Sequence, residues 1–329
     1  MVTNTAGAQL TMKYRTLGKT GINVSVIGLG TWQFGGEWGK AFGAAEVTAM
    51  LATAREVGIN LIDTAECYGD HLSESLIGSA LAGGSIGRRE DWVIATKFGH
   101  TFHGHLNRTD DRSASDVARQ LEASLRALRT DYLDLYHFHS VRDGEFDNTE
   151  LRSVLDKAVR EGKVRHIGNS ISNSGAAGDG SYQVDASTAA HVAAIQIVYN
   201  RLDRKPEASI LPSAARQGLG VLARVPLASG FLSGKYRADQ TSPESFPAGD
   251  VRRSQDAGKI AERLREVEQI QRAEVPPGES MARWALAWCL QHAAVSCVIP
   301  GCKNVQQVID NAGAADLDIV RADHPLASK

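Results

Sequence analysis

Short apolar segments alternate with amphipathic segments along most of this 329-residue chain, and this rhythm restricts the folds available to it. The apolar segments are rich in Val, Ile and Leu, which is typical of parallel strands buried on both faces. The first six begin about 30–40 residues apart, the length of one strand–helix unit. The eight predicted strands are 26–31, 59–64, 92–97, 132–138, 164–170, 193–198, 220–225 and 295–300.

The segments between these strands carry helical patterns, for example at 44–58 and 114–130. Four apolar residues at helical spacing define one face of the second segment: Val117, Leu121, Leu125 and Leu128. Eight strands, each followed by a helix, predict an α/β fold of the closed (β/α)8 TIM barrel type.

The alternative is an open, doubly wound sheet that binds a dinucleotide after its first strand. That fold carries G-x-G-x-x-G at this turn, whereas GLGTWQFGG lacks the third glycine in register. Polar residues able to do chemistry also recur at the C-terminal ends of several strands, where barrels place their active sites. We therefore favour the barrel.

The ends of the barrel are predicted to carry additional segments. Residues 1–12 are small and polar, and we expect a disordered N-terminal tail. YRTLGKTGINVSV contains two short extended pieces around Gly18–Gly21, which predicts an N-terminal β-hairpin.

A long segment separates the seventh and eighth strands. It contains a stretch rich in Gly, Ser, Pro and Arg (233–258) and two helical patterns near 259–272 and 278–292. We interpret this segment as an insertion between strands 7 and 8, so residues 13–329 are expected to form a single domain.

The charge balance excludes several classes of partner. The chain has 36 Lys+Arg and 38 Asp+Glu, a net charge of −2, so it lacks the basic excess that binding to nucleic acid or acidic membranes requires. The N-terminus shows no signal-peptide pattern. The most apolar stretch, 281–299, is interrupted by Arg283, Gln291 and His292, which argues against a membrane span. We expect no nucleic-acid and no membrane partner.

Cysteine and histidine spacing gives no sign of a disulfide framework or a metal centre. The four cysteines are far apart or without C-x-x-C spacing: Cys67, Cys289, Cys297 and Cys302. This favours a reducing compartment and a cytoplasmic location. The one histidine cluster, HTFHGH (His100, His103 and His105), is predicted to form a loop after the third strand, and no further ligand is evident, so we expect no metal site. The sequence contains no G-x-S-x-G motif, which argues against a hydrolase with a catalytic triad.

Four residues able to move or stabilise protons lie at or just after the ends of three consecutive strands: Asp63, Tyr68, Lys97 and His139. Singly, each has a structural explanation, such as a solvated lysine or a hydrogen-bonded core histidine. In a barrel, however, these strand ends converge. A phenol has a pKa of about 10, and an adjacent ammonium lowers it. We therefore expect Lys97, held by Asp63, to make Tyr68 a proton donor, with His139 hydrogen-bonding the substrate or relaying a proton.

Two further segments are predicted to bind phosphate. RVPLASGFLSGKY (224–236) runs from the seventh strand into a Gly/Ser-rich loop, whose N–H groups and Lys235 suit an anion. VIPGCKNVQQVIDNAG (298–313) places a helix N-terminus and Lys303 after the eighth strand. Two such sites indicate a long ligand with separated phosphates, as a dinucleotide has.

These motifs resemble those of the aldo/keto reductases, NAD(P)H-dependent enzymes built on a (β/α)8 barrel. The resemblance covers about 13–315 and rests on YRTLGKTGINVSVIGLGTW, NLIDTAECYG, VIATKFG, DYLDLYHFH, GKVRHIGNS, VPLASGFLSGKY and VIPGCKNVQQVIDN. It implies a catalytic tetrad of Asp63, Tyr68, Lys97 and His139, with Tyr68 as the general acid that protonates a carbonyl oxygen while the cofactor supplies hydride.

The resemblance also implies a cofactor site, and the cation at Lys303 indicates NADP(H) over NAD(H). The expected cofactor-binding residues are Thr31, Trp32, Asp63, Ser170, Gln196, Arg224, Pro226, Leu227, Ser229, Gly230, Leu232, Lys235, Gly301, Lys303, Gln307, Asp310 and Asn311. Arg224 replaces an aromatic ring that stacks on the nicotinamide in many relatives, and a guanidinium plane can stack similarly. Gln307 stands where an Arg often grips the 2′-phosphate.

Two functions follow from the resemblance. The first is an NADP(H)-dependent oxidoreductase that reduces an aldehyde or ketone, and the intact tetrad favours it. The alternative is a nucleotide-sensing or regulatory subunit that binds NADP(H) with little turnover. The expected partner is a small carbonyl compound, and the sequence does not indicate an oligomeric state. Loop residues expected either to form the substrate pocket or to pack the loops are Trp32, Phe34, Trp38, Phe98, Phe102, His103 and His105.

Overall fold

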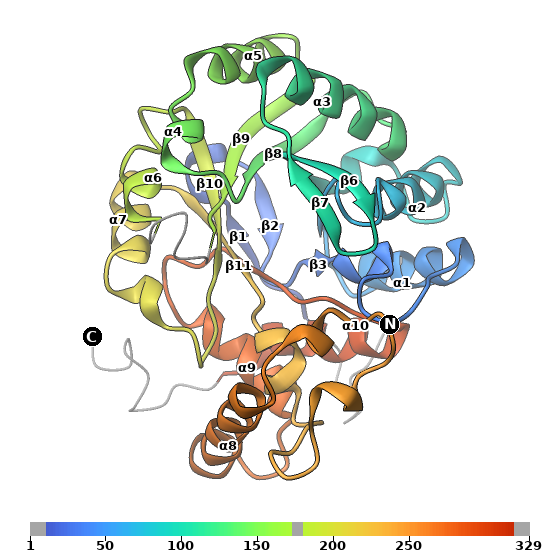
Figure 1. The fold of residues 1–329 in the computed structure, drawn as a ribbon, viewed down its shortest axis with the longest axis vertical. Helices are drawn as coiled ribbons and strands as arrows, with labels where there is room; N and C mark the ends of the chain where they lie inside the picture. Colours follow the sequence, from blue (N-terminus) through green and yellow to red (C-terminus); the bar gives the residue numbers. More distant parts are fainter. Residues whose placement is uncertain (1–10, 173–179, 319–329) are drawn as a thin grey trace.

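All eight predicted strands are present and form one parallel sheet in the order β12-β11-β10-β9-β8-β5-β4-β3. The structure is a computed structural model that describes residues 11–172 and 180–318. Figure 1 shows the strands at the centre with helices around them. The strands are β3 (Leu29–Gly30), β4 (Leu61–Asp63), β5 (Val93–Phe98), β8 (Leu133–His139), β9 (Val164–Ser170), β10 (Val192–Val198), β11 (Gly220–Arg224) and β12 (Cys297–Ile299).

The first and last strands meet and confirm the predicted TIM barrel. Two parallel bridges, between Ile27 and Val298 and between Gly30 and Gly301, join the two ends of the sheet. A Cβ atom at Gly30 would lie only 2.8 Å from the carbonyl oxygen of Ile299. The barrel closes here because position 30 carries no side chain.

Alternate residues of each strand face the barrel interior. Leu61, Ala95 and Leu135 belong to an apolar cluster inside the barrel. Two positions further along β4 and β5 stand Asp63 and Lys97, which hydrogen-bond to each other. The interior therefore changes from apolar to ionisable toward the C-terminal ends of the strands.

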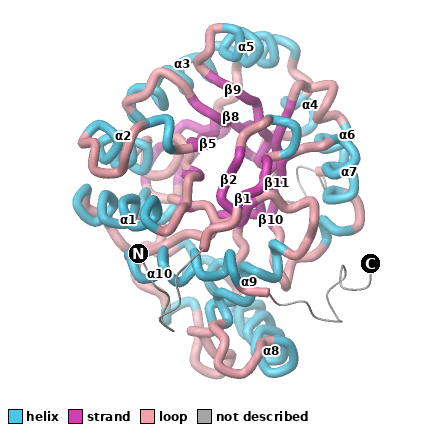
Figure 2. Tube along the Cα trace, turned by 180° about the vertical axis from the view of Figure 1, so that it is seen from behind, coloured by secondary structure: helices cyan, strands magenta, loops and turns pink. Residues whose placement is uncertain are grey.

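The predicted N-terminal hairpin is confirmed. β1 (Tyr14–Thr16) and β2 (Asn23–Ser25) pair in antiparallel orientation. Leu17 and Val24 are fully buried in the same apolar cluster that fills the barrel. Figure 2, seen from behind, shows β1 and β2 lying across the barrel. The hairpin thus closes the end opposite the ionisable residues.

The helices follow the strands in chain order and cover the barrel. α3 begins after Ser113, whose hydroxyl oxygen accepts a hydrogen bond from the Asp116 backbone N–H at 3.2 Å, and it buries the predicted apolar face. Among the described residues, no helix has the length and apolar character needed to cross a membrane. The helices on the barrel are α1 (Ala44–Glu56), α2 (Leu72–Ala82), α3 (Ala114–Leu128), α4 (Asp143–Phe146), α5 (Thr149–Arg160), α6 (Ser181–Asp185), α7 (Ile210–Gln217) and α10 (Val305–Ala312).

The predicted insertion between the seventh and eighth barrel strands is also present. It contains α8 (Ala257–Glu274) and α9 (Met281–Leu290), close to the expected ranges. Figure 1 shows both helices at the lower end of the molecule. Trp284 of α9 is fully buried, so this helix is part of the main core.

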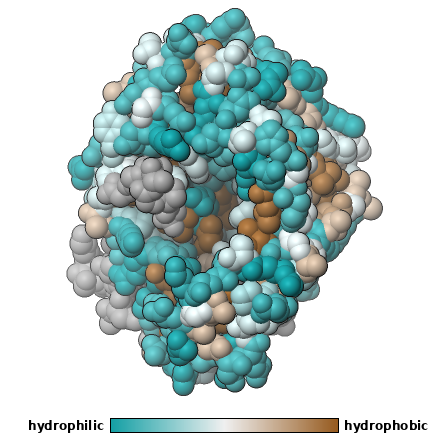
Figure 3. All heavy atoms as spheres, in the orientation of Figure 1, coloured by the Kyte–Doolittle hydropathy of each residue, from teal (hydrophilic) through white to brown (hydrophobic). Residues whose placement is uncertain are grey.

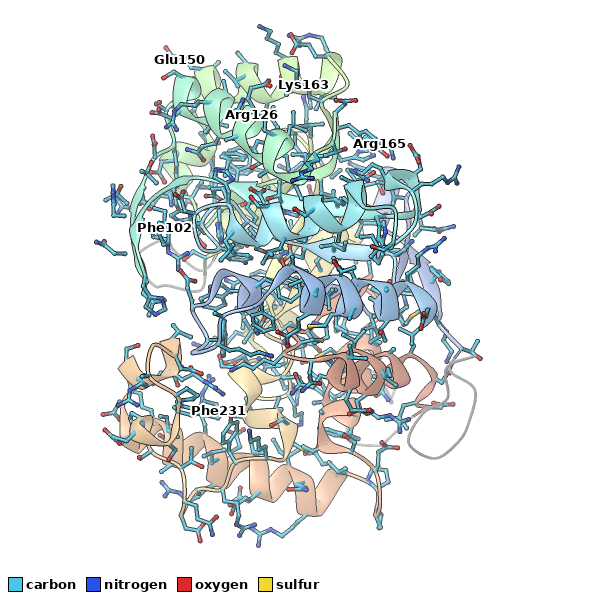
Figure 4. The ribbon with its side chains drawn as sticks, turned by 90° about the vertical axis from the view of Figure 1, so that its right-hand side faces the viewer. Phe102, Arg126, Glu150, Lys163, Arg165 and Phe231 are labelled. Carbon is cyan, nitrogen blue, oxygen red and sulfur yellow. The ribbon has the colours of Figure 1, made fainter. Side chains whose placement is uncertain are left out.

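A second hairpin corrects the expectation that residues 100–105 form a loop. β6 (His100–Gly104) and β7 (Asn107–Asp110) pair in antiparallel orientation. Neither strand shows the alternating apolar pattern that marks a half-buried strand, so the sequence did not predict them. Figure 4 shows Phe102 of this hairpin on the side of the molecule opposite Arg165, which lies near the start of β9.

The first described residues contact the rest of the chain. The Thr11 backbone N–H donates to the Asp316 carboxylate at 2.6 Å, and the half-buried Met12 packs against the core. The tail predicted for residues 1–12 otherwise falls on 1–10, which lie outside the described residues.

Candidate active site

Asp63, Lys97 and Tyr68 are joined by hydrogen bonds at the open end of the barrel. Asp63 ends β4 and Lys97 lies on the neighbouring β5, so both side chains face the interior. The Lys97 ammonium donates to Asp63 Oδ2 at 3.0 Å, to the Thr64 carbonyl oxygen at 2.6 Å and to Tyr68 Oη at 3.2 Å. Since Lys97 is fully buried, its charge depends on Asp63 for compensation.

The electrostatics of Tyr68 differ from the expectation. Burial raises the pKa of Tyr68 to about 12, and the charge of Lys97 opposes this shift only in part. The predicted net decrease was wrong because the sequence did not show how completely the phenol is removed from water. Burial also lowers the pKa of Lys97, but Asp63 and Tyr68 reverse that effect and leave it above its ordinary value. At neutral pH, Tyr68 is a protonated phenol beside a charged ammonium.

His139, the last residue of β8, lies near the ring of Tyr68. The two ring centroids are 6.4 Å apart and the rings are nearly perpendicular, at 83°. Burial, and after it the neighbouring His100 and Lys97, lower the pKa of His139 well below its ordinary value. The imidazole is therefore neutral at physiological pH and offers one N–H donor and one acceptor nitrogen.

Asp63, Tyr68 and His139 line a cavity of about 660 Å³. Figure 3 shows a hollow near the centre of this face, with apolar atoms inside it and hydrophilic atoms around it. The expected site residues that line the cavity are Thr31, Trp32, Asp63, Tyr68, His139, Gln196, Arg224, Pro226, Leu227, Ser229, Gly230, Lys235, Gly301, Lys303, Gln307, Asp310 and Asn311.

Three expected site residues are not part of the cavity wall. Lys97 lies beneath Tyr68 and acts on the cavity through it. Ser170 is buried, and its hydroxyl donates to Gln196 Oε1 at 3.2 Å, so it orients Gln196. Leu232 is fully buried in the core. Neither Ser170 nor Leu232 reaches the cavity, because each side chain faces packed protein.

Gln196 is fixed at both ends of its amide. Besides accepting from Ser170, it donates through Nε2 to Asp63 Oδ1 at 2.6 Å. The carboxylate of Asp63 is thereby bound on one oxygen by Gln196 and on the other by Lys97. This network holds the polar layer of the barrel rigid beneath the cavity.

Three of the five Lys and Arg residues that line the cavity lie close together: Lys235, Arg252 and Lys303. The Lys303 ammonium donates to the Trp38 carbonyl oxygen at 2.9 Å and lies 3.8 Å from Asp250 Oδ2. Burial and then repulsion by Arg252 lower the pKa of Lys303, although Asp250 opposes this. Crowded cations of this kind attract an anionic ligand group.

The loop after β11 bends sharply on the same cavity wall. Ser229 (φ 59°) and Gly230 (φ 92°) adopt left-handed backbone conformations, and both line the cavity. Such turns direct backbone N–H groups toward anions. Ser280, the N-cap of α9, lines the cavity as well, so the positive end of that helix dipole faces it.

Known proteins resemble this chain in sequence, fold and length. The sequence pattern of the aldo/keto reductase family matches residues 26–326. The chain belongs to the aldo/keto reductase family. Aldo-keto reductase YhdN of Bacillus subtilis (strain 168) is 32% identical over 306 residues, which cover 90% of this chain and 87% of the relative. A probable voltage-gated potassium channel subunit beta of Oryza sativa subsp. japonica is 28% identical over 310 residues, covering 93% and 92%.

A solved member of the family has the same architecture. The holo form of an aldo-keto reductase from Bacillus halodurans matches with a TM-score of 0.77 at 26% identity, over 96% of this chain and 95% of that one. This member of the aldo/keto reductases is thus a TIM-barrel protein of an oxidoreductase family.

Several residues in the cavity wall of this aldo/keto reductase were missed by the sequence analysis. His100 and Arg108 come from hairpin β6–β7, which was not predicted. Arg252 comes from the insertion, and its guanidinium donates to the Ser229 carbonyl oxygen at 3.3 Å and to Tyr236 Oη at 3.0 Å. The high arginine content of 233–258 was the one available signal.

The residues expected around the substrate divide between the cavity wall, the core and the hairpin. Trp32 and Trp38 line the cavity. Phe34 and Phe98 are instead fully buried in the core. The three hairpin residues Phe102, His103 and His105 do not line it either. An aromatic residue near a strand end has no sequence signal that separates packing from ligand contact.

Proposed function

We propose that this chain is an NADP(H)-dependent oxidoreductase that reduces an aldehyde or ketone to an alcohol, with Tyr68 as general acid. The observation that carries this proposal is the hydrogen-bonded series Asp63–Lys97–Tyr68, with the phenol facing a cavity of about 660 Å³. The alcohol product, the cytoplasmic location and the single domain over 13–329 belong to the same proposal.

The side chains divide the acid–base work. Tyr68 is protonated at neutral pH and donates its proton as negative charge develops on the carbonyl oxygen. Lys97 stabilises the phenolate that remains, because its ammonium already contacts the phenol oxygen. The neutral His139 offers an N–H to the same substrate oxygen and orients it.

The cavity fits a dinucleotide with phosphate groups. When bound, NADP(H) supplies the hydride that reduces the carbonyl carbon. Lys235, Lys303 and the left-handed turn at Ser229 suit phosphates. Arg224 is a buried guanidinium whose Nε has no hydrogen-bond partner among the described residues, and Gln196 holds an oriented amide beside it. These two groups suit the polar nicotinamide end.

The test compares two Tyr-to-Phe variants for NADPH consumption with 4-nitrobenzaldehyde and methylglyoxal. Tyr68→Phe should lower kcat at least 100-fold, within the range of general-acid effects, and leave NADPH binding by fluorescence nearly unchanged. Tyr132→Phe is the matched control, because its hydroxyl has no described partner and lies outside the cavity. Unchanged turnover in Tyr68→Phe would remove Tyr68 as the acid.

The alternative is a nucleotide-sensing or regulatory subunit with little turnover. It is favoured by the 28% identical relatives described as probable potassium channel β subunits in Oryza sativa and Arabidopsis thaliana. Tight NADPH binding without consumption over a broad panel of aldehydes and ketones would select this alternative. Turnover that depends on Tyr68 would select the enzyme.

A further inference from the structure

We propose that Glu66, Cys67, His100 and His139 form a binding site for a borderline divalent metal ion such as Zn²⁺ in the wall of the cavity. Each residue offers one donor atom, and the four atoms lie within 4.8 Å of one another. No residue spacing along the chain indicates this site, because the donors come from the turn after β4, from β6 and from the end of β8.

The separations are close to those of a tetrahedral zinc centre. Zn–N bonds of about 2.0 Å and Zn–S bonds of about 2.3 Å place neighbouring ligand atoms about 3.3–3.6 Å apart. Cys67 Sγ is 3.7 Å from His139 Nδ1, and His100 Nδ1 is 3.2 Å from Glu66 Oε1. His139 Nδ1 lies 4.0 Å from the other Glu66 oxygen, Oε2, and the four donor atoms as a whole lie within 4.8 Å of one another. Side-chain rotations therefore have to shorten the longer separations to complete the centre.

The buried carboxylate of Glu66 is the strongest single observation in favour of a bound cation. Its side chain is 3% exposed, and Oε2 has no hydrogen-bond partner among the described residues. The imidazole nitrogens of His100 and His139 lie 3.2 and 4.0 Å from its carboxylate oxygens. A buried carboxylate oxygen without a donor is costly, and a bound cation removes that cost.

The charges of the proposed centre balance. Glu66 and a deprotonated Cys67 supply two negative charges, and an imidazole that binds a metal is a neutral ligand, so one divalent ion gives a neutral buried centre. The proton of the Cys67 thiol leaves to solvent as the metal–sulfur bond forms. A sulfur, nitrogen and carboxylate donor set favours Zn²⁺ over Ca²⁺ or Mg²⁺.

Burial and the charge of Glu66 raise the pKa of the Cys67 thiol, so the thiolate depends on the bound cation and on a neighbouring arginine. The Arg108 guanidinium donates to Cys67 Sγ at 3.0 Å, and hydrogen bonds of this kind stabilise metal-bound thiolates. Glu37 lies 3.9 Å from the other Arg108 nitrogen and offsets its positive charge near the ion.

Occupation of the site has a functional consequence, and this part rests on the proposed function. His139 is the group that orients the substrate oxygen, and both histidines line the cavity. An ion on His139 changes the position of the imidazole and narrows the space beside Tyr68. Zn²⁺ should therefore inhibit carbonyl reduction reversibly, and EDTA should restore activity.

The test is binding of metal alone to the full-length chain, measured by Zn²⁺ calorimetry and by Co²⁺ absorption. We expect one equivalent bound and a thiolate-to-cobalt charge-transfer band. Cys67→Ser should abolish the band, and Cys67→Ser and His100→Asn should each weaken binding at least tenfold. His103→Asn, on the same hairpin but outside the cluster, is the matched control. Tyr68→Phe should still bind the ion, which separates this site from the catalytic proposal.

Two results would overturn the inference. One is wild-type protein that shows neither stoichiometric binding nor a charge-transfer band, a measurement that needs no variant. The other is unchanged affinity in folded Cys67→Ser and His100→Asn, which would mean adventitious surface binding only.

Discussion

Replacing Lys97 with Met tests whether a buried ammonium compensates the Asp63 carboxylate inside the barrel. The side chains of Lys97 and Asp63 are 0% and 5% exposed, and Nζ lies 3.0 Å from Oδ2. At an effective dielectric constant of about 20, Coulomb's law gives about 5.5 kcal/mol for this separation. Both charges lose hydration on folding, so the net effect is smaller. Because the substitution leaves a buried carboxylate unpaired, we expect it to lower the free energy of unfolding by about 3–5 kcal/mol.

The double variant Asp63→Asn/Lys97→Met should recover most of that loss. An asparagine oxygen still accepts the hydrogen bond that Gln196 donates to Asp63 Oδ1 at 2.6 Å. The Thr64 carbonyl oxygen loses its Lys97 donor, which costs about 1 kcal/mol. We therefore expect the double variant to unfold within about 2 kcal/mol of the wild type, since the largest single cost is absent.

The measurement is equilibrium urea denaturation followed by circular dichroism and tryptophan fluorescence. Coincident transitions with an unchanged m-value make the midpoints comparable. Lys157→Met is the control, because its side chain is 68% exposed and its ion pair with Glu161, at 3.7 Å, contributes little. The single variant Asp63→Asn completes the comparison. If the double variant loses as much free energy of unfolding as Lys97→Met and Asp63→Asn combined, the two charges are not coupled and the reasoning is wrong.

Two further predictions concern acid stability and cofactor choice. Burial and then the charge of Lys97 lower the pKa of His137 to about 3, so below about pH 6.5 the unfolded chain binds a proton that the folded chain does not, and the wild type loses stability. His137→Leu should remove about 2 kcal/mol of the loss between pH 7 and pH 5, and an unchanged loss would contradict this assignment. Lys303→Met should weaken NADPH binding by about 1–3 kcal/mol in fluorescence titrations and leave NADH binding nearly unchanged. Equal losses for both cofactors would remove Lys303 as the 2′-phosphate contact.

The order of the strands and the shared position of the ionisable residues at their C-terminal ends could be predicted from the sequence, because both depend on short-range patterns. The apolar runs marked the strands, and the closed barrel then required Asp63, Lys97 and His139 to meet. The N-terminal hairpin followed from its glycines in the same way.

Features that depend on packing did not follow from the sequence. The raised pKa of Tyr68 results from burial by several elements, which spacing along one strand does not report. The polar hairpin β6–β7 lacked an alternating apolar pattern, so the places of His100 and Arg108 in the cavity wall were missed. Phe34 and Phe98 had the composition of pocket residues and proved to be core residues.

Leu17 and Val24 of the N-terminal hairpin close one end of the barrel, and this restricts how a ligand reaches Tyr68. With that end filled by side chains, anything that reaches Tyr68 arrives through the opposite mouth. Behind the hairpin, the apolar side chains of Leu61, Ala95 and Leu135 also fill the barrel interior, so the inner end of the site is closed by packing at two levels.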